Sequence, residues 1–251
     1  KYVSKHLGKL DRYLPRGNKK DVILSAGSGI EECTITDKTI KGYASVSYSD
    51  LQEKSELLCN AGTIFWNLLY ESKINFNADY SHKGQNWSPF GAYSVFAGTV
   101  HFDGNEYTVQ PKNSFGYIEK NWGKDLVSPS FHINCSNLNS VISGKNLENS
   151  CFVVNGVFDD CVSVLTKIDD RVILFPADKK KKFSITYNCL EMPDDEDGIK
   201  LHWTVSVHNK EYVIDIDVFC KTEEMLVRDY ESPAGERKVL KVLAGGTGTG
   251  E

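Results

Sequence analysis

Long apolar runs are absent from this sequence, as are the marks of export and of nucleic-acid binding. No stretch of about 18 apolar residues occurs, so no segment is a candidate for a membrane-spanning helix. No pattern typical of a secretory signal peptide is present. The net charge of -5 argues against nucleic acid or an anionic membrane surface as the main partner. We therefore expect a cytoplasmic protein that binds no nucleic acid and does not insert stably into membranes.

Cysteine spacings of the metal-binding and disulfide type are also missing. The chain has seven cysteines, an odd number, with no CxxC pair and no histidine at zinc-finger spacing. They are Cys33, Cys59, Cys135, Cys151, Cys161, Cys189 and Cys220. Most stand inside apolar runs, where cysteine behaves as a small hydrophobic residue. We predict free, buried thiols in a reducing compartment, and no metal site.

Helical periodicity is weak, whereas alternation of apolar and polar residues is widespread. It is clear in "TIFWNLLYES" (63–72), "FSITYNC" (183–189), "LHWTVSVH" (201–208) and "YVIDIDVFC" (212–220). A period of two predicts half-buried β-strands. Two short helices are expected, one lined by Leu7, Leu10, Tyr13 and Leu14 and the other over residues 50–58.

Turn signals between these segments predict hairpins. They are Asp103-Gly104, Asn209-Lys210 and the longer loop "YESPAGERKV". Many strands joined by hairpins predict an antiparallel all-β barrel or sandwich. The strand rhythm breaks near residues 110–125, so we expect an N-terminal β half (1–115) and a C-terminal β half (116–251), unless both form one continuous domain. Further segments are expected beyond both ends.

The stretch "SFGYIEKNWG" (114–123) gathers aromatic, acidic, basic and amide side chains between two glycines. In a strand, Tyr117, Glu119 and Asn121 share one face and can line a cavity together. Trp122 then lies on the opposite face, unless a bulge turns it inward. The alternative is that the charged residues are solvated and that the two aromatic residues only pack.

The longer segment "GTVHFDGNEYTVQPKNSFGYIEKNWGKDLVSPSF" (98–131) resembles the tocopherol cyclase-like family. Members carry a "dGkeY" hairpin, then a GY-[IA]-[ED]-KNWG signature, then Ser-Pro and an aromatic cluster. Weaker similarity covers roughly residues 25–251, as in "GSGIEECTITDKTIKGYASVS" and "SGKNLENSCF". The resemblance implies a calycin-like barrel or sandwich of two lipocalin-like halves. The activity it implies is closure of a prenylated phenol to a chromanol.

The implied reaction protonates an alkene and traps the resulting cation with the phenol oxygen, without a metal or organic cofactor. On this resemblance Glu119 is the candidate acid, with Tyr117 and Asn121 as its catalytic neighbours. Such an acid must keep its proton near neutral pH, which a dry apolar pocket promotes. Aromatic faces stabilise a cation by about 0.5–2 kcal/mol each.

Four further residues are candidates for substrate binding: Trp122, His132, Trp87 and Phe131. Trp87 lies among aromatic residues in "GQNWSPFGAY", where it can form a pocket wall or simply pack in a turn. His132 follows the apolar Phe131 and is either a base in the cavity or an ordinary hydrogen-bonded histidine.

The sequence thus predicts a protein that holds a hydrophobic or prenylated small molecule in a β-barrel pocket. It either catalyses a cofactor-free, acid-promoted cyclisation or isomerisation, or is a non-catalytic lipocalin-like binding protein for an apolar metabolite. A carbohydrate-active sandwich is a third interpretation, based on aromatic residues and on Asp215 and Asp217, which share a strand face. The sequence specifies neither the ligand nor the oligomeric state.

Overall fold

A computed structural model describes residues 12–13, 24–26, 33–53, 61–78, 80–123, 127–177, 183–231 and 239–251. Within these ranges the chain is built from antiparallel β-strands, with one α-helix, α1 (Tyr48–Glu53), and one 3₁₀ helix, η2 (Thr222–Glu224). The antiparallel all-β prediction is therefore confirmed. The described strands form open sheets and no closed barrel. None of the described helices has the length and apolar character needed to cross a bilayer.

The chain folds into two compact units, each built from two separate segments of the sequence. The first comprises Lys1–Ile74 and Tyr93–Tyr117, and the second comprises Asn75–Ala92 and Ile118–Glu251. The chain passes between them inside the long strand β7 (Gln85–Phe102) and again inside β9 (Phe115–Gly123). The chain passes into the second unit for the last time after Tyr117, and the sequence placed its boundary between residues 115 and 116. Residues 75–92 belong to the second unit, although they lie within the half of the sequence that was assigned to the first.

The first unit is an antiparallel sheet. Its strands follow the order β1 (Arg12–Tyr13), β2 (Leu24–Ala26), β3 (Cys33–Ile35), β4 (Thr39–Val46), β5 (Gly62–Ile74) and the second half of β7, which also pairs with β8 (Asn105–Val109) and β9. The β7–β8 hairpin turns at Asp103 and Gly104, with φ of 47° and 78°. Two positive φ values define the type I′ turn that an Asp-Gly pair predicts.

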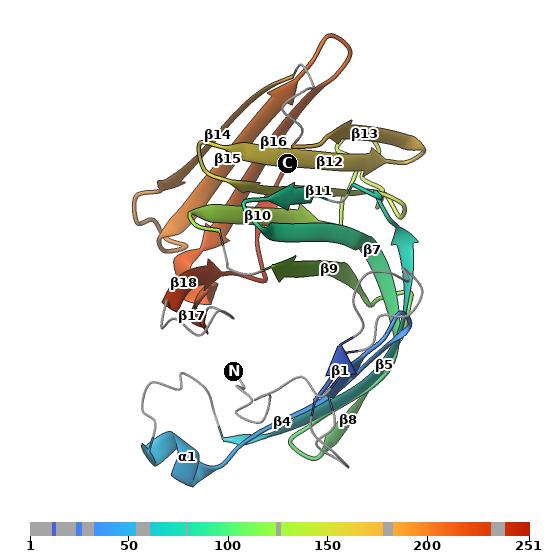
Figure 1. The fold of residues 1–251 in the computed structure, drawn as a ribbon, viewed down its shortest axis with the longest axis vertical. Helices are drawn as coiled ribbons and strands as arrows, with labels where there is room; N and C mark the ends of the chain where they lie inside the picture. Colours follow the sequence, from blue (N-terminus) through green and yellow to red (C-terminus); the bar gives the residue numbers. More distant parts are fainter. Residues whose placement is uncertain are drawn as a thin grey trace. The chain divides into compact units, whose positions relative to one another are not determined.

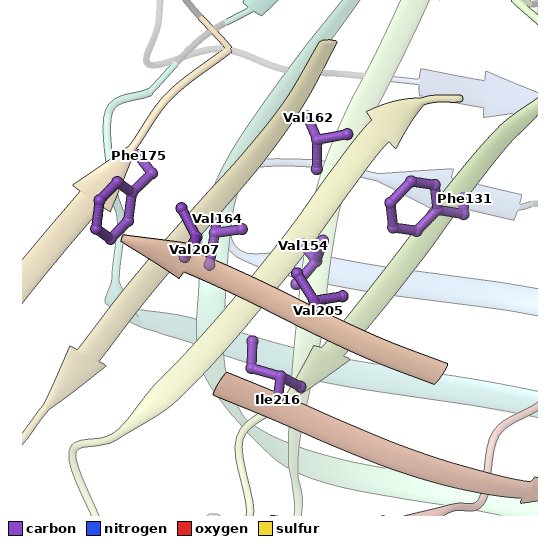
Figure 2. Close-up of a cluster of buried hydrophobic side chains, with 8 residues drawn as sticks. All are labelled: Phe131, Val154, Val162, Val164, Phe175, Val205, Val207 and Ile216. Carbon is purple, nitrogen blue, oxygen red and sulfur yellow. The ribbon is translucent and has the colours of Figure 1, made fainter. Parts of the chain in front are cut away.

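The second unit contains a β-sandwich. One sheet has the order β10 (Ser130–Cys135), β11 (Cys151–Val157), β12 (Cys161–Ile168) and β13 (Arg171–Phe175). The other has the order β14 (Ser184–Glu191), β15 (Lys200–His208), β16 (Val213–Lys221) and β19 (Thr249–Gly250). Strands of the two sheets cross each other in Figure 1, and Figure 2 shows the core between them. A separate hairpin joins β17 (Leu226–Glu231) to β18 (Val239–Ala244).

The sandwich core follows from the alternation in the sequence. Val154 and Val164 from one sheet and Val205 and Val207 from the other meet in it, each at most 1% exposed (Figure 2). Burying such side chains stabilises the fold by about 1.5–3 kcal/mol each.

The β10–β13 sheet is also buried on the face that points away from this core. Val153 and Leu165 alternate with the core residues and are both 0% exposed. Burial on two faces explains why β11 and β12 read as nearly continuous apolar runs instead of alternating ones. The polar residues of this outer face form part of the site described next.

Candidate functional site

Glu119, on β9, accepts hydrogen bonds on both carboxylate oxygens. The indole Nε1–H of Trp87, on β7, donates to Oε2 over 2.6 Å. The Asn121 amide Nδ2 donates to Oε1 over 2.6 Å. Trp87 is 1% exposed, whereas 28% of the Glu119 side chain reaches solvent. A buried indole therefore fixes one oxygen of a carboxylate whose edge remains accessible.

His132, on β10, is the fourth member of this group. Its Nδ1 lies 3.8 Å from Glu119 Oε2 and 3.3 Å from Asn155 Oδ1, while Asn134 Nδ2 lies 2.9 Å from its Nε2. An amide nitrogen can only donate and an amide oxygen can only accept. Asn155 and Asn134 therefore hold the two ring nitrogens of His132, with Nδ1 on the side of Glu119.

The sheet register explains why these residues meet. Asn155 is the partner of His132 across the β10–β11 pair, and Asn134 lies two residues further along β10 on the same face. Glu119 and Asn121 are likewise two residues apart on β9. We call Trp87, Glu119, Asn121 and His132 the Glu119 centre.

One predicted site residue, Phe131, has another position. It precedes His132 on β10 and so points to the opposite face, into the sandwich core, where it is 7% exposed and stacks on Trp203 with ring centroids 5.0 Å apart. Tyr117 is half-buried and lies two residues before Glu119 on β9. The Trp122 side chain lies outside the described residues.

Asn134 and Asn155 are members of the site that sequence reasoning missed. The position of Asn134 could have been predicted from alternation, because this residue comes two positions after the candidate His132 and so shares its strand face. Asn155 has no local signal, since its position depends on how β10 and β11 pair.

Asp215 and Asp217, on which the carbohydrate interpretation rests, have different surroundings from each other. Asp217 lies 2.7 Å from Nε2 of His202 on the neighbouring strand, while Asp215 is exposed. A second group of carboxylates lies on the surface loop that precedes β15. Lys200, the first residue of β15, has its Nζ 3.1 Å from an oxygen of Asp195 and 3.1 Å from an oxygen of Asp197. The hydrogen bond from Lys200 lowers the pKa of Asp195, and the hydrogen bonds to Asp197 and Asp195 raise the pKa of Lys200. This surface cluster is thus internally paired.

The Glu119 centre has the elements of a proton-transfer site. A carboxylate and an imidazole lie near each other, both are partly accessible, and their other polar atoms are fixed by neighbours. Such an arrangement can accept a proton from a bound molecule and return it elsewhere. It can equally well anchor a polar group by hydrogen bonding.

No family model, curated protein or solved structure matches this chain. The resemblance to the tocopherol cyclase-like family therefore stays a prediction, based on the residues quoted above.

Proposed function

We propose that this protein is a calycin-related, tocopherol cyclase-like protein that binds a hydrophobic or prenylated small molecule beside Glu119 and His132. It transfers a proton to or from this molecule without a cofactor, which results in cyclisation or isomerisation. The observation that carries the proposal is the convergence of Trp87 and Asn121 on the two oxygens of Glu119, next to His132. The quoted segment 98–131 supports the choice of substrate class.

The hydrogen bonds favour isomerisation over cyclisation. Trp87 and Asn121 both donate to Glu119, so both carboxylate oxygens act as hydrogen-bond acceptors in this structure. Alkene protonation would need a donor at this position. Removal of a proton from a carbon next to a polar group, followed by its return at another carbon, requires an acceptor of this kind.

In this proposal Trp87 and Asn121 are positioning residues. They hold the carboxylate in one orientation, as a base must be held to meet a bound molecule. His132 is the second group for proton transfer, with Asn134 and Asn155 fixing the ring.

A non-catalytic binding protein is the second candidate. It is favoured by the full set of partners in the centre, since both oxygens of Glu119 and both nitrogens of His132 already have hydrogen-bonding neighbours. A satisfied network of this kind specifies a structure and can also recognise a hydroxyl group of a ligand.

The test uses the full chain and a geranylgeranyl-substituted hydroquinone in deuterium oxide. Mass spectrometry of the recovered compound measures deuterium that has entered carbon positions. We expect time-dependent incorporation with the wild type. Glu119→Gln should lower its rate by about 10² to 10⁴, the usual contribution of acid–base catalysis, with affinity changed only a few-fold.

Glu196→Gln is the matched control, because Glu196 is an exposed acid on a surface loop, and it should leave the rate unchanged. Saturable binding without any deuterium incorporation would favour the binding protein. Incorporation that is equal in wild type and Glu119→Gln would contradict the role of Glu119.

A further inference from the structure

Two tight hairpins of the second unit bring metal-ligating side chains together. His82 ends β6 (Tyr80–His82) and pairs with Gln85 across a two-residue turn, in which Lys83 and Gly84 have φ of 46° and 84°. These values define a type I′ turn, which fixes the position of His82 closely.

The second hairpin joins β11 to β12. Its turn is closed by a 3.2 Å hydrogen bond from the Asp160 N–H to the Val157 carbonyl, and Asp159 has a left-handed φ of 57°. Asp160 is the last residue of this turn and Cys161 is the first residue of β12. The turn thus presents a carboxylate and a thiol side by side.

The ligand atoms of His82, Asp160 and Cys161 all lie within 4.8 Å of one another. His82 Nε2 and Asp160 Oδ2 are 2.8 Å apart. The side chains of His82 and Asp160 are 14% and 18% exposed and Cys161 is 9% exposed, while Asp160 as a whole residue lies at the surface of the turn. Within the described ranges this is the one group of three or more such side chains that meets the distance.

We propose that His82, Asp160 and Cys161 form a binding site for a zinc-like divalent cation. Imidazole nitrogen, carboxylate oxygen and thiolate sulfur are the three ligand types that Zn²⁺ takes in proteins. Metal–ligand distances of about 2.0–2.3 Å at tetrahedral angles place the ligand atoms about 3.3–3.6 Å apart. His82 Nε2 and Asp160 Oδ2 lie slightly closer than this range, and no pair of ligand atoms is more than 4.8 Å apart, so small rotations of the side chains would form the site.

Three protein ligands leave the fourth tetrahedral position for water. A cation at this position would tie the β6–β7 hairpin to the β11–β12 hairpin. None of the three ligands belongs to the Glu119 centre, and the inference does not depend on the proposed function.

The ammonium group of Lys83 would compete with a bound cation for the carboxylate of Asp160. Its Nζ lies 2.9 Å from Asp160 Oδ2, and 63% of its side chain is exposed. An exposed ammonium gains little from such a pair, about 0–1 kcal/mol, so it can move into solvent when a divalent ion arrives. Removal of Lys83 should therefore tighten metal binding.

The direct test is a titration of the reduced, full-length chain with Co²⁺, the spectroscopic substitute for Zn²⁺. We expect a thiolate-to-cobalt charge-transfer band and the intense visible absorption of a tetrahedral site. Both should saturate at one equivalent and disappear when Zn²⁺ is added. Lys83→Gln should lower the Kd several-fold.

Variants assign the ligands. Cys161→Ser should abolish the charge-transfer band, and Cys189→Ser, a change at a half-buried thiol on another sheet, should preserve it. His82→Gln and Asp160→Asn should each raise the Kd by about tenfold or more. Circular dichroism checks that each variant is folded, and His82→Gln tests the site without changing a buried thiol.

The proposal is overturned if the wild type shows no charge-transfer band. It is also overturned if Cys161→Ser keeps the band, because the metal would then be bound to another thiol. Unchanged affinity in folded His82→Gln would exclude the histidine and with it the proposed ligand set.

Discussion

The indole of Trp87 and the carboxylate of Glu119 are joined by a 2.6 Å hydrogen bond across 32 residues of sequence. The indole is among the most buried side chains of the described chain, at 1% exposure, and the carboxylate has one edge in solvent. The bond joins β7, along which the chain enters the first unit, to β9, along which the chain leaves it. It also determines the direction in which the carboxylate of the candidate site points.

Trp87→Phe tests this bond, because phenylalanine keeps an aromatic ring but has no N–H. A hydrogen bond to a charged group contributes about 1.5–3 kcal/mol, so the free energy of unfolding should fall by that order. Urea denaturation measures the loss. The double variant with Glu119→Gln should lose less than the sum of the single variants, whereas strict additivity would show that the two side chains are not coupled.

Gly42 on β4 leaves room for the indole of its cross-strand partner Trp66. A Cβ at Gly42 would come within 2.0 Å of a Trp66 ring carbon. Gly42→Ala should therefore destabilise the protein by about 1–3 kcal/mol through overpacking. The control Gly246→Ala meets nothing within 4 Å and should be nearly neutral. Adding Trp66→Val should recover much of the loss, and failure to recover would contradict the predicted clash.

Alkaline pH should weaken the fold through Cys151. Burial raises the pKa of this thiol from 9.0 to about 12, so the unfolded chain releases the proton first. The stabilising contribution is therefore complete below about pH 9 and is lost as the pH rises toward 12. Cys151→Ala should flatten the fall in unfolding free energy between about pH 9 and 11, and an unchanged slope would contradict this assignment. Tyr70, whose pKa burial also raises to about 12, contributes in the same direction.

Thiol chemistry tests the state of the cysteines. No disulfide joins the six cysteines in the described residues. The unfolded, unreduced protein should therefore show at least these six reactive thiols in a colorimetric assay. In the native protein Cys151, at 0% exposure, should react among the slowest. Recovery of fewer thiols than six, with more appearing after reduction, would indicate disulfides.

Strands and turns were predictable because their signals are local. The alternating segments 183–189 and 201–208 overlap β14 and β15, and Asp103-Gly104 forms the expected turn. The exchange of residues 75–92 between units was not predictable. It depends on which strands pair, and a period of two carries no information about partners.

In the candidate site, too, local relationships could be predicted from the sequence and contacts between distant strands could not. Glu119 and Asn121 were placed together because they alternate on one strand, whereas the contact with Trp87 required the fold. Phe131 and His132 were both assigned to the ligand, although neighbouring residues of a strand face opposite ways. Alternation alone would have separated them, and the structure places Phe131 in the core.

The central claim is that Glu119 and His132 together face a bound molecule. Nuclear magnetic resonance of ¹⁵N-labelled histidine tests it most directly, with His132→Asn assigning the signals. We predict that the ¹⁵N shifts of His132 change when the geranylgeranyl hydroquinone is added and change much less in Glu119→Gln. His132 signals that stay unchanged while the compound binds would contradict the account.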